Sequence, residues 1–516
     1  MLSKKILIIP ALFMAQSALA DQNQPLSAID WLSDTVTAPI VMQPVSKPQK
    51  YMQTDVASSA SVEDVTVTPL DGPTPDAVGL LPVSVTGLPR DFWGTSQSAD
   101  LGRIISKAPV RALPALQELL HMILLAELDA PVDGAGGADL FLARIDKLLD
   151  IGQLQQAQAM LERAGTNTAP IFRRWFDVTL LTGTENSACE VLKNNASFSP
   201  TFPARIFCLA RTGDWNAAAV TLETANALGK LEAGQYDLIS RFLDPELFEG
   251  EADLPRPEHI SPLTFIMFEA IGQPLNTSIL PRAFAVADLR PTTGWKAQIE
   301  AAERLVLSGA IDENQLLGIY TKQKPAASGG VWERLFAVQA LDKAISADDA
   351  TAVAKYLPIV VKHLKKAQLL APIADFFGVK LAQIQLDADS ATMAFHLGLL
   401  SEDYEKIATG YSAVTSRDKF LVALAHGDLS IVQPFDATTR AISAAFQSKQ
   451  TAPEYSQLIK DKKLGEAVLL AISRFPSSSN GNLENARKSL ILLRSVGLED
   501  IARRSALQLI LLDQQD

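Results

Sequence analysis

The side chains that most often carry catalysis or bind metals are few and widely separated in this sequence. The 516 residues contain five histidines and two cysteines. No His-Glu-x-x-His pattern is present, and two cysteines are too few to form a zinc cluster. The histidines are His121, His259, His363, His396 and His426. We therefore expect no metal site and no cofactor.

Motifs for covalent catalysis are missing as well. The sequence contains neither a Gly-x-Ser-x-Gly turn nor a glycine-rich loop for phosphate. Ser416 and Lys419 have the Ser-x-x-Lys spacing, but the companion Ser-Asp-Asn and Lys-Thr-Gly motifs are absent. Adjacent carboxylates such as Glu402 and Asp403 are typical of a helix start, where the helix dipole favours negative charge. We predict no catalytic residue and a protein that is not an enzyme.

Two glycine turns place a tryptophan and a basic residue at the start of a predicted helix. The first pair is Trp295 with Lys296, and the second is Trp332 with Arg334. Free backbone N–H groups at a helix start favour an anion, so each pair could hold an anionic or glycan ligand. The alternative, which we favour, is that both tryptophans fasten their helices to the core.

The two cysteines bear on both stability and compartment. Cys189 and Cys208 are 19 residues apart on two consecutive predicted helices. Antiparallel packing of these helices can bring the Cα atoms within the roughly 5–6 Å that a disulfide needs. In an oxidising compartment we expect a bridge, which stabilises by ~3 kcal/mol in the chain-entropy account. The alternative is a pair of buried thiols in the same interface.

The start of the sequence has the three parts of a secretory signal peptide. Residues 1–20 contain Lys4 and Lys5, an apolar run, and the small-residue cleavage pattern that ends at Ala20. A membrane anchor needs about 20 uninterrupted apolar residues, and Pro10 and polar residues interrupt this stretch. We expect cleavage and a mature chain that is periplasmic or secreted.

The charge of the mature chain excludes some classes of partner. Cleavage removes Lys4 and Lys5 and changes the net charge from −12 to −14. Nucleic acids and anionic membrane surfaces are poor partners for such an acidic chain. No later stretch is long and apolar enough to cross a bilayer, so we expect no transmembrane segment in the mature chain.

Residues 21–90 differ in composition from the rest of the chain. They are rich in Pro, Ser, Thr, Val and Asp without a helical period, which favours a disordered or extended tail. Trp31 and Leu32 end a short apolar cluster that either docks on a partner or packs back on the helical part. Residues 62–68 are rich in Val and Thr and suggest an extended linker, or a strand that adds to a sheet edge.

Two stretches share small and large apolar residues at the same steps. They are Gly152, Leu154, Ala157, Leu161 and Ala164, and Gly213, Trp215, Ala218, Leu222 and Ala225. This pattern resembles the second helix of a tetratricopeptide-type hairpin, in which alanines allow close helix approach and the glycine permits the turn. The glycines are 61 residues apart, close to two repeats of about 34 residues.

The chain after residue 90 is predicted to be nearly all helix. Four prolines between residues 245 and 262 mark a break. We therefore expect an N-terminal helical-repeat subdomain at residues 91–247, a bend or linker at 248–262 and a C-terminal helical-repeat subdomain at 263–516. Predicted helices that can pair as antiparallel hairpins along the whole chain indicate an all-α fold of the α-solenoid type, similar to tetratricopeptide repeats.

A periplasmic superhelix of short hairpins is similar to the non-catalytic part of soluble lytic transglycosylases. That family carries its acid glutamate in a Glu-Ser motif of a separate catalytic domain, and no Glu-Ser dipeptide occurs here. The resemblance implies an architecture and transfers no catalytic residue. The tail and the two tryptophan segments also resemble secreted proteins of α-proteobacteria, which implies no particular activity.

We expect a scaffold or binding module that recognises protein partners of the cell envelope on a preformed concave surface. The alternative is a peptidoglycan-acting enzyme, or an accessory to one, with a site near residues 250–300. A third possibility is a purely structural envelope protein that self-associates. A deep cleft with converging carboxylates would favour the enzyme, and a shallow groove would favour the scaffold.

Overall fold

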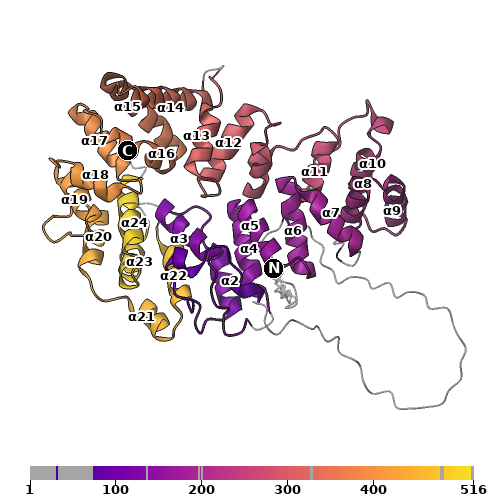
Figure 1. Cartoon of the computed structure of the whole chain (residues 1–516), viewed down its shortest axis with the longest axis horizontal. Helices are drawn as coiled ribbons and strands as arrows, with labels where there is room; N and C mark the ends of the chain where they lie inside the picture. Colours follow the sequence, from indigo (N-terminus) through magenta and orange to yellow (C-terminus); the bar gives the residue numbers. More distant parts are fainter. Residues whose placement is uncertain are drawn as a thin grey trace, which may run out of the picture.

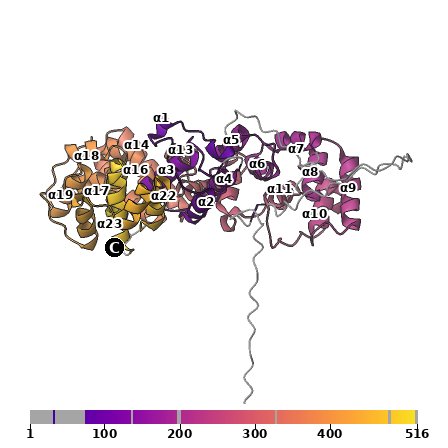
Figure 2. The ribbon, with the colours of Figure 1, turned by 90° about the horizontal axis from the view of Figure 1, so that it is seen from below.

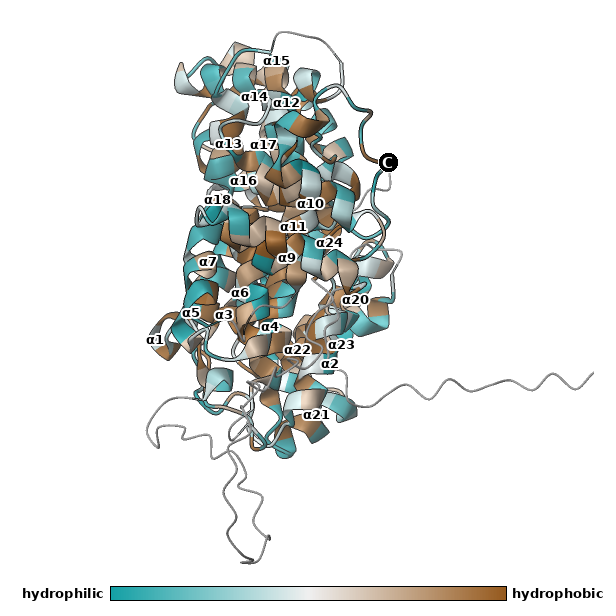
Figure 3. Cartoon of the chain, turned by 90° about the vertical axis from the view of Figure 1, so that its right-hand side faces the viewer, coloured by the Kyte–Doolittle hydropathy of each residue, from teal (hydrophilic) through white to brown (hydrophobic). Residues whose placement is uncertain are grey.

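The computed structural model describes residues 31–32, 74–134, 137–195, 198, 201–325, 329–476 and 481–512. These residues form helices and connecting loops without a β-strand, which confirms the all-α prediction. In the described part of the chain, no helix has both the length and the apolar composition needed to span a membrane. Hydrophobic and hydrophilic residues alternate along most helices (Figure 3), the pattern of amphipathic helices that bury one face.

Folded structure begins before residue 91, where the tail was predicted to end. Two short elements, η1 (Pro75–Ala77) and α1 (Val83–Thr86), pack against the helical body. The buried guanidinium of Arg144 donates hydrogen bonds to the carbonyls of Val78 (2.8 Å) and Ala126 (2.7 Å), among others. Composition alone predicted a tail here, because this anchor lies far along the chain from the segment that it holds.

The first series of helices runs from the middle of the molecule to one end (Figure 1). Its elements are α2 (Ser98–Lys107), α3 (Pro114–Leu125), α4 (Asp139–Ile151), α5 (Leu154–Ala164), α6 (Ala169–Thr182), α7 (Glu185–Asn194), α8 (Phe202–Arg211), α9 (Trp215–Ala227), α10 (Gln235–Leu243), η3 (Pro245–Phe248) and α11 (Pro262–Ala270). Most helices pack against the next one in sequence, and α11 returns to pack against α6.

The second series crosses back over the first and forms the other end of an elongated body (Figures 1 and 2). It begins with η4 (Thr277–Ile279), η5 (Arg282–Leu289), α12 (Trp295–Val306), α13 (Glu313–Thr321), α14 (Val331–Ser346), α15 (Ala350–Ala367) and α16 (Leu370–Leu381). It continues with α17 (Ala388–Gly398), α18 (Tyr404–Gly410), α19 (Ser416–Ala425), α20 (Ala437–Gln447), α21 (Pro453–Lys460), α22 (Leu464–Arg474), α23 (Leu483–Ser495) and α24 (Glu499–Leu511).

The last helices pack against the first ones, so the chain closes on itself. Helix α22 lies against α2, and α24 lies against α3. Arg504 of α24 forms an ion pair with Glu118 of α3 at 2.7 Å, and the Gln508 side chain accepts a hydrogen bond from the Ala115 N–H. In a linear solenoid each unit contacts only its neighbours, and these contacts depart from that arrangement.

The buried apolar residues divide the molecule differently from the predicted subdomains. One cluster joins residues 32–287 with residues 395–510, and a second cluster spans residues 299–400. The proline-rich segment 248–262 packs at the edge of the first cluster through Leu254 and Ile260. Helices α12 to α17 therefore have a core of their own, and α14 and α15 lie at the edge of the body, at the top left in Figure 1.

The two glycine-led stretches form helix α5 and helix α9, each after a tight turn. Gly152 and Gly213 have φ angles of 93° and 86°, a region that glycine adopts without strain. Leu154 is 1% exposed, but Trp215 is 50% exposed. Both helices pack between their neighbours in sequence, α5 between α4 and α6 and α9 between α8 and α10, but α9 lies at an end of the body (Figure 2).

Candidate binding groove

The two tryptophans selected from the sequence meet in space. Trp295 starts α12 and Trp332 lies in the first turn of α14, and their ring centroids are 5.1 Å apart. The Nε1 of Trp295 donates a hydrogen bond of 2.9 Å to the Ile319 carbonyl at the end of α13. Both rings are partly buried against the core of α12 to α17, so they fasten these helices together.

The basic residues beside the tryptophans have separate acidic partners. Arg334 binds Glu303 in bidentate fashion, at 2.8 Å from Nε and 2.6 Å from Nη2. Lys296 is exposed and pairs with Glu300 at 3.6 Å. Burial acts to lower the pKa of Arg334, but the hydrogen bond to Glu303, the charge of Glu303 and the contact with Tyr320 together outweigh it, so the pKa is raised. Each cation is matched locally, which argues against a joint site for an anion.

A groove opens beside Trp332, between α14 and α15. Its volume is about 390 Å³, and its walls are mainly apolar or aromatic. The residues that line it are Pro325, Trp332, Glu333, Phe336, Ala337, Tyr356, Ile359 and His363. Phe336 is 60% exposed and Ile359 is 41% exposed. Large apolar side chains that gather around a hollow at the surface are typical of a binding site.

Phe336, Tyr356 and Ile359 were not predicted as site residues, because they lie outside the buried stripe of each helix. In α15 that stripe is Val353, Leu357, Val360 and Leu364, all fully buried. Tyr356, Ile359 and His363 recur at steps of three and four on the adjacent face. This second stripe of large side chains, beside the buried one, is the feature of the sequence that could have indicated a groove.

Lysines border the groove along α15. Lys355, Lys362 and Lys366 are exposed, and none of them has a carboxylate within ion-pair distance among the described residues. The Nζ of Lys355 lies 5.2 Å from the centre of the Tyr356 ring, a cation–π distance. Glu333 is the acidic residue in the lining. The groove thus combines an apolar floor with a mostly positive border.

The predicted docking cluster at Trp31 and Leu32 packs against the helical body. Leu32 is 2% exposed, and its carbonyl accepts a hydrogen bond of 2.9 Å from Arg173. The Trp31 ring meets Phe284 edge-on with centroids 5.5 Å apart. These contacts favour the alternative in which the cluster packs back on its own chain. Residues 62–68 lie outside the described residues.

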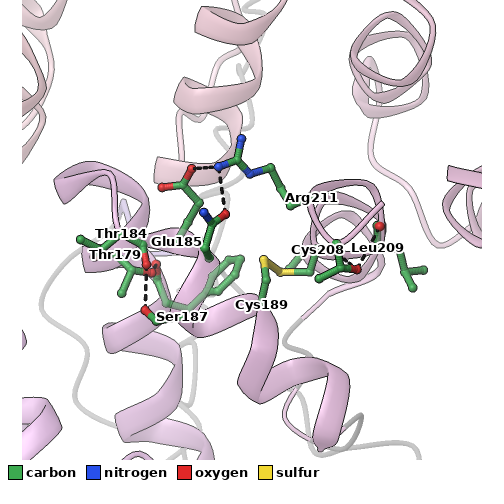
Figure 4. The surroundings of a disulfide bond; sticks show 12 residues. Thr179, Thr184, Glu185, Ser187, Cys189, Cys208, Leu209 and Arg211 are labelled. Carbon is green, nitrogen blue, oxygen red and sulfur yellow. Dashed lines mark hydrogen bonds and ion pairs between the residues drawn. A yellow bond between two sulfur atoms is a disulfide. The ribbon is translucent and has the colours of Figure 1, made fainter. Parts of the chain in front are cut away.

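Cys189 of α7 and Cys208 of α8 form a disulfide, with Sγ atoms 1.98 Å apart and Cα atoms 4.9 Å apart (Figure 4). Both cysteines are buried. Next to them, Arg211 pairs with Glu185 at 2.8 Å across the same two helices (Figure 4). The bridge and the ion pair therefore fix one helix against the next near an end of the body.

A second hollow lies in the region where the alternative enzyme site was expected. Its volume is about 350 Å³, and Arg241, Glu246, Glu249 and Glu251 are among its lining residues. The glutamates are exposed, and Glu251 pairs with Arg241 at 3.2 Å. The structure buries none of these three carboxylates in an apolar pocket, the environment that most often prepares a general acid. Among the described residues, no group of three or more His, Cys, Asp or Glu side chains is placed to hold a metal.

No protein-family model, no curated protein and no solved structure matches this chain. The groove between α14 and α15, with its lysine border, is the candidate functional site.

Proposed function

We propose that this protein is a binding module that works as a scaffold in the cell envelope and takes a protein partner in the groove between α14 and α15. The observation that carries the proposal is the exposed apolar surface of Phe336 and Ile359 beside Trp332 and Tyr356. Aromatic side chains are enriched at protein interfaces, and a shallow groove between two helices suits a peptide segment. No covalent chemistry is part of this proposal.

A solenoid of tetratricopeptide-like hairpins is the architecture that we propose for α4 to α9. Support comes from the glycine turns at Gly152 and Gly213 and from the fully buried Ala157 and Ala218 in the helices that follow. The alanines allow a neighbouring helix to approach closely. In this proposal the solenoid of α4 to α9 is a rigid arm, and the second series of helices carries the binding groove.

A periplasmic location is proposed from the signal-like residues 1–20, which lie outside the described residues, and from the disulfide. Disulfides form and persist mainly in oxidising compartments, so the bridge between Cys189 and Cys208 supports this location. The peptidoglycan-acting alternative has no comparable support, because the glutamates of the second hollow are exposed.

The test is affinity capture from a periplasmic extract with three forms of the mature protein. They are the natural protein, a groove variant with Phe336→Ser and Ile359→Ser, and a control variant with Val414→Ser. Val414 is 81% exposed and lies away from the groove lining, so its replacement controls for loss of exposed apolar surface.

We expect the same proteins with the natural protein and the control, and their loss with the groove variant. Capture that does not depend on Phe336 and Ile359, or capture of peptidoglycan fragments alone, would contradict the proposed function.

A further inference from the structure

We infer that the groove between α14 and α15 selects an acidic peptide segment that presents one or two large apolar side chains beside carboxylates. This inference rests on the proposed function and adds the chemistry of the partner. The apolar lining would hold the large side chains, and the lysines along α15 would contact the carboxylates.

The lysines form one row along the groove. Lys355, Lys362 and Lys366 are separated by steps of seven and four residues, which places them on one side of α15. This row lies next to the face that carries Tyr356 and Ile359, and the Lys355 ammonium reaches the Tyr356 ring. A ligand held by the apolar residues would therefore lie beside all three ammonium groups.

Charge complementarity identifies the partner as acidic. The chain as a whole has a net charge of −12, so three exposed lysines on one side of α15 are a local exception. Glu333 in the lining is on α14, across the groove from this row. Opposite charges along an interface favour one partner over another and orient it, and like charges exclude the wrong partner.

The length of the row favours a peptide over an anionic lipid headgroup. From Lys355 to Lys366 the helix advances by about 16 Å at the α-helical rise. A single phosphate group contacts one part of such a row, whereas carboxylates spaced along a peptide contact all of it. A groove of about 390 Å³ also matches a few side chains rather than a whole domain.

The inference is tested with a fluorescein-labelled amphipathic peptide of about three helical turns. One face carries leucine and phenylalanine, and the other carries glutamate. A matched peptide carries lysine in place of every glutamate. Binding to the mature full-length protein is followed by fluorescence anisotropy at two ionic strengths.

Two charge-reversal variants separate the effect of the lysine row on peptide binding from the effect of the protein's net charge. The first combines Lys355→Glu, Lys362→Glu and Lys366→Glu. The control combines Lys193→Glu, Lys230→Glu and Lys449→Glu, three exposed lysines that are absent from the groove lining. Both variants change the net charge by the same amount. Circular dichroism and thermal melting establish that each is folded.

We expect the glutamate peptide to bind and the lysine peptide to bind at least about ten-fold more weakly. Charge reversal of the lysine row should weaken binding of the glutamate peptide about ten-fold or more, while the control variant should bind it with an affinity within about two-fold of the natural protein. Affinity should also fall as the salt concentration rises. Equal binding of both peptides, or equal effects of both variants, would overturn the inference.

Other occupants give distinct results. Vesicles of phosphatidylglycerol that bind through the same lysines and displace the peptide would overturn the peptide assignment. Self-association of the protein that is lost in Phe336→Ser would also overturn the peptide assignment, because a second copy of the chain would then occupy the groove. If periplasmic capture depends on Phe336 but not on the three lysines, the proposed function stands and the acidic chemistry is wrong. If capture is independent of Phe336 as well, the proposed function itself fails.

Discussion

Trp295 and Trp332 lie with their ring centroids 5.1 Å apart although 37 residues separate them in the sequence. Their contact connects the starts of α12 and α14 across α13, and Trp332 continues into the groove wall. One aromatic pair therefore links the core of the second series to the proposed binding surface.

Trp295→Phe should lower the free energy of unfolding by about 1–2 kcal/mol. The change removes the hydrogen bond to the Ile319 carbonyl and part of the packed ring. Urea unfolding followed by circular dichroism measures the effect. Trp215→Phe is the matched control, because Trp215 is 50% exposed and has no such bond in the described structure. Equal effects of the two changes would contradict the role given to Trp295.

Arg144→Met should be strongly destabilising, by about 3 kcal/mol or more, because it leaves buried carbonyls without their donor. The Arg144 guanidinium is fully buried and donates to the carbonyls of Leu124, Val78 and Ala126. Burial lowers the pKa of Arg144 to about 10, so it stays charged at neutral pH.

Limited proteolysis gives a local measurement of the same change. Cleavage within residues 74–90 should be faster in Arg144→Met than in Arg205→Met, a control at an exposed position. Unchanged cleavage there, despite a loss of global stability, would show that Arg144 does not hold this segment.

Ionisation of the buried Asp76 carboxyl should lower the free energy of unfolding as the pH rises from about 4 to above 6. Burial raises the pKa of Asp76 from 3.8 to about 6, despite the hydrogen bond from the Phe141 N–H. The folded state therefore binds the proton more tightly than the unfolded state, and this stability is lost as pH rises through the folded pKa. The contribution is up to about 3 kcal/mol.

The measurement is urea unfolding of the natural protein and Asp76→Asn at pH 4.5 and pH 7. Asparagine keeps an acceptor for Phe141, so the variant should be relatively more stable at pH 7 than at pH 4.5. A stability difference that does not change between the two pH values would contradict the prediction.

Protonation of His121 should have the opposite pH dependence: it should lower the free energy of unfolding as the pH falls. Burial lowers the pKa of His121 from 6.5 to about 4, so the neutral ring is favoured in the folded state. Its contribution is present above pH 6.5 and is lost as pH falls toward 4. The ring contacts Gln153 at 3.0 Å, and Gln153 donates to the Gly309 carbonyl at 2.9 Å.

His121→Gln should therefore reduce the acid sensitivity of the protein, as measured by thermal melting between pH 4 and pH 7. His259→Gln is the control, because it makes the same replacement at an exposed position. Parallel profiles for the natural protein and His121→Gln would exclude His121 as the titrating group.

Loss of the disulfide should cost about 3 kcal/mol, mainly through the unfolded state. The variant with Cys189→Ser and Cys208→Ser should unfold at lower urea, and a reductant should shift the natural protein toward it. The same reductant should not affect the double variant. Free thiols at both positions in protein purified from the periplasm would contradict the bridge.

Local sequence pattern predicted the helices well where apolar residues recur on one face. The helix starts beside Trp295 and Trp332 were predicted, because a glycine turn precedes each of them. Helices α21 and α22 fall within the stretch after residue 90 that was predicted to be nearly all helix.

The sequence by itself determined the all-helical fold, since helical periodicity depends on residues three and four positions apart. It also singled out Trp295 and Trp332 as unusual, and Cys189 and Cys208 as possible partners. The tertiary structure decided which apolar residues stay exposed. Phe336 and Ile359 become a groove only when α14 packs against α15, and the lysine row becomes its border only in that arrangement. Contacts between α24 and α3 connect residues nearly 400 positions apart, and no local pattern records them.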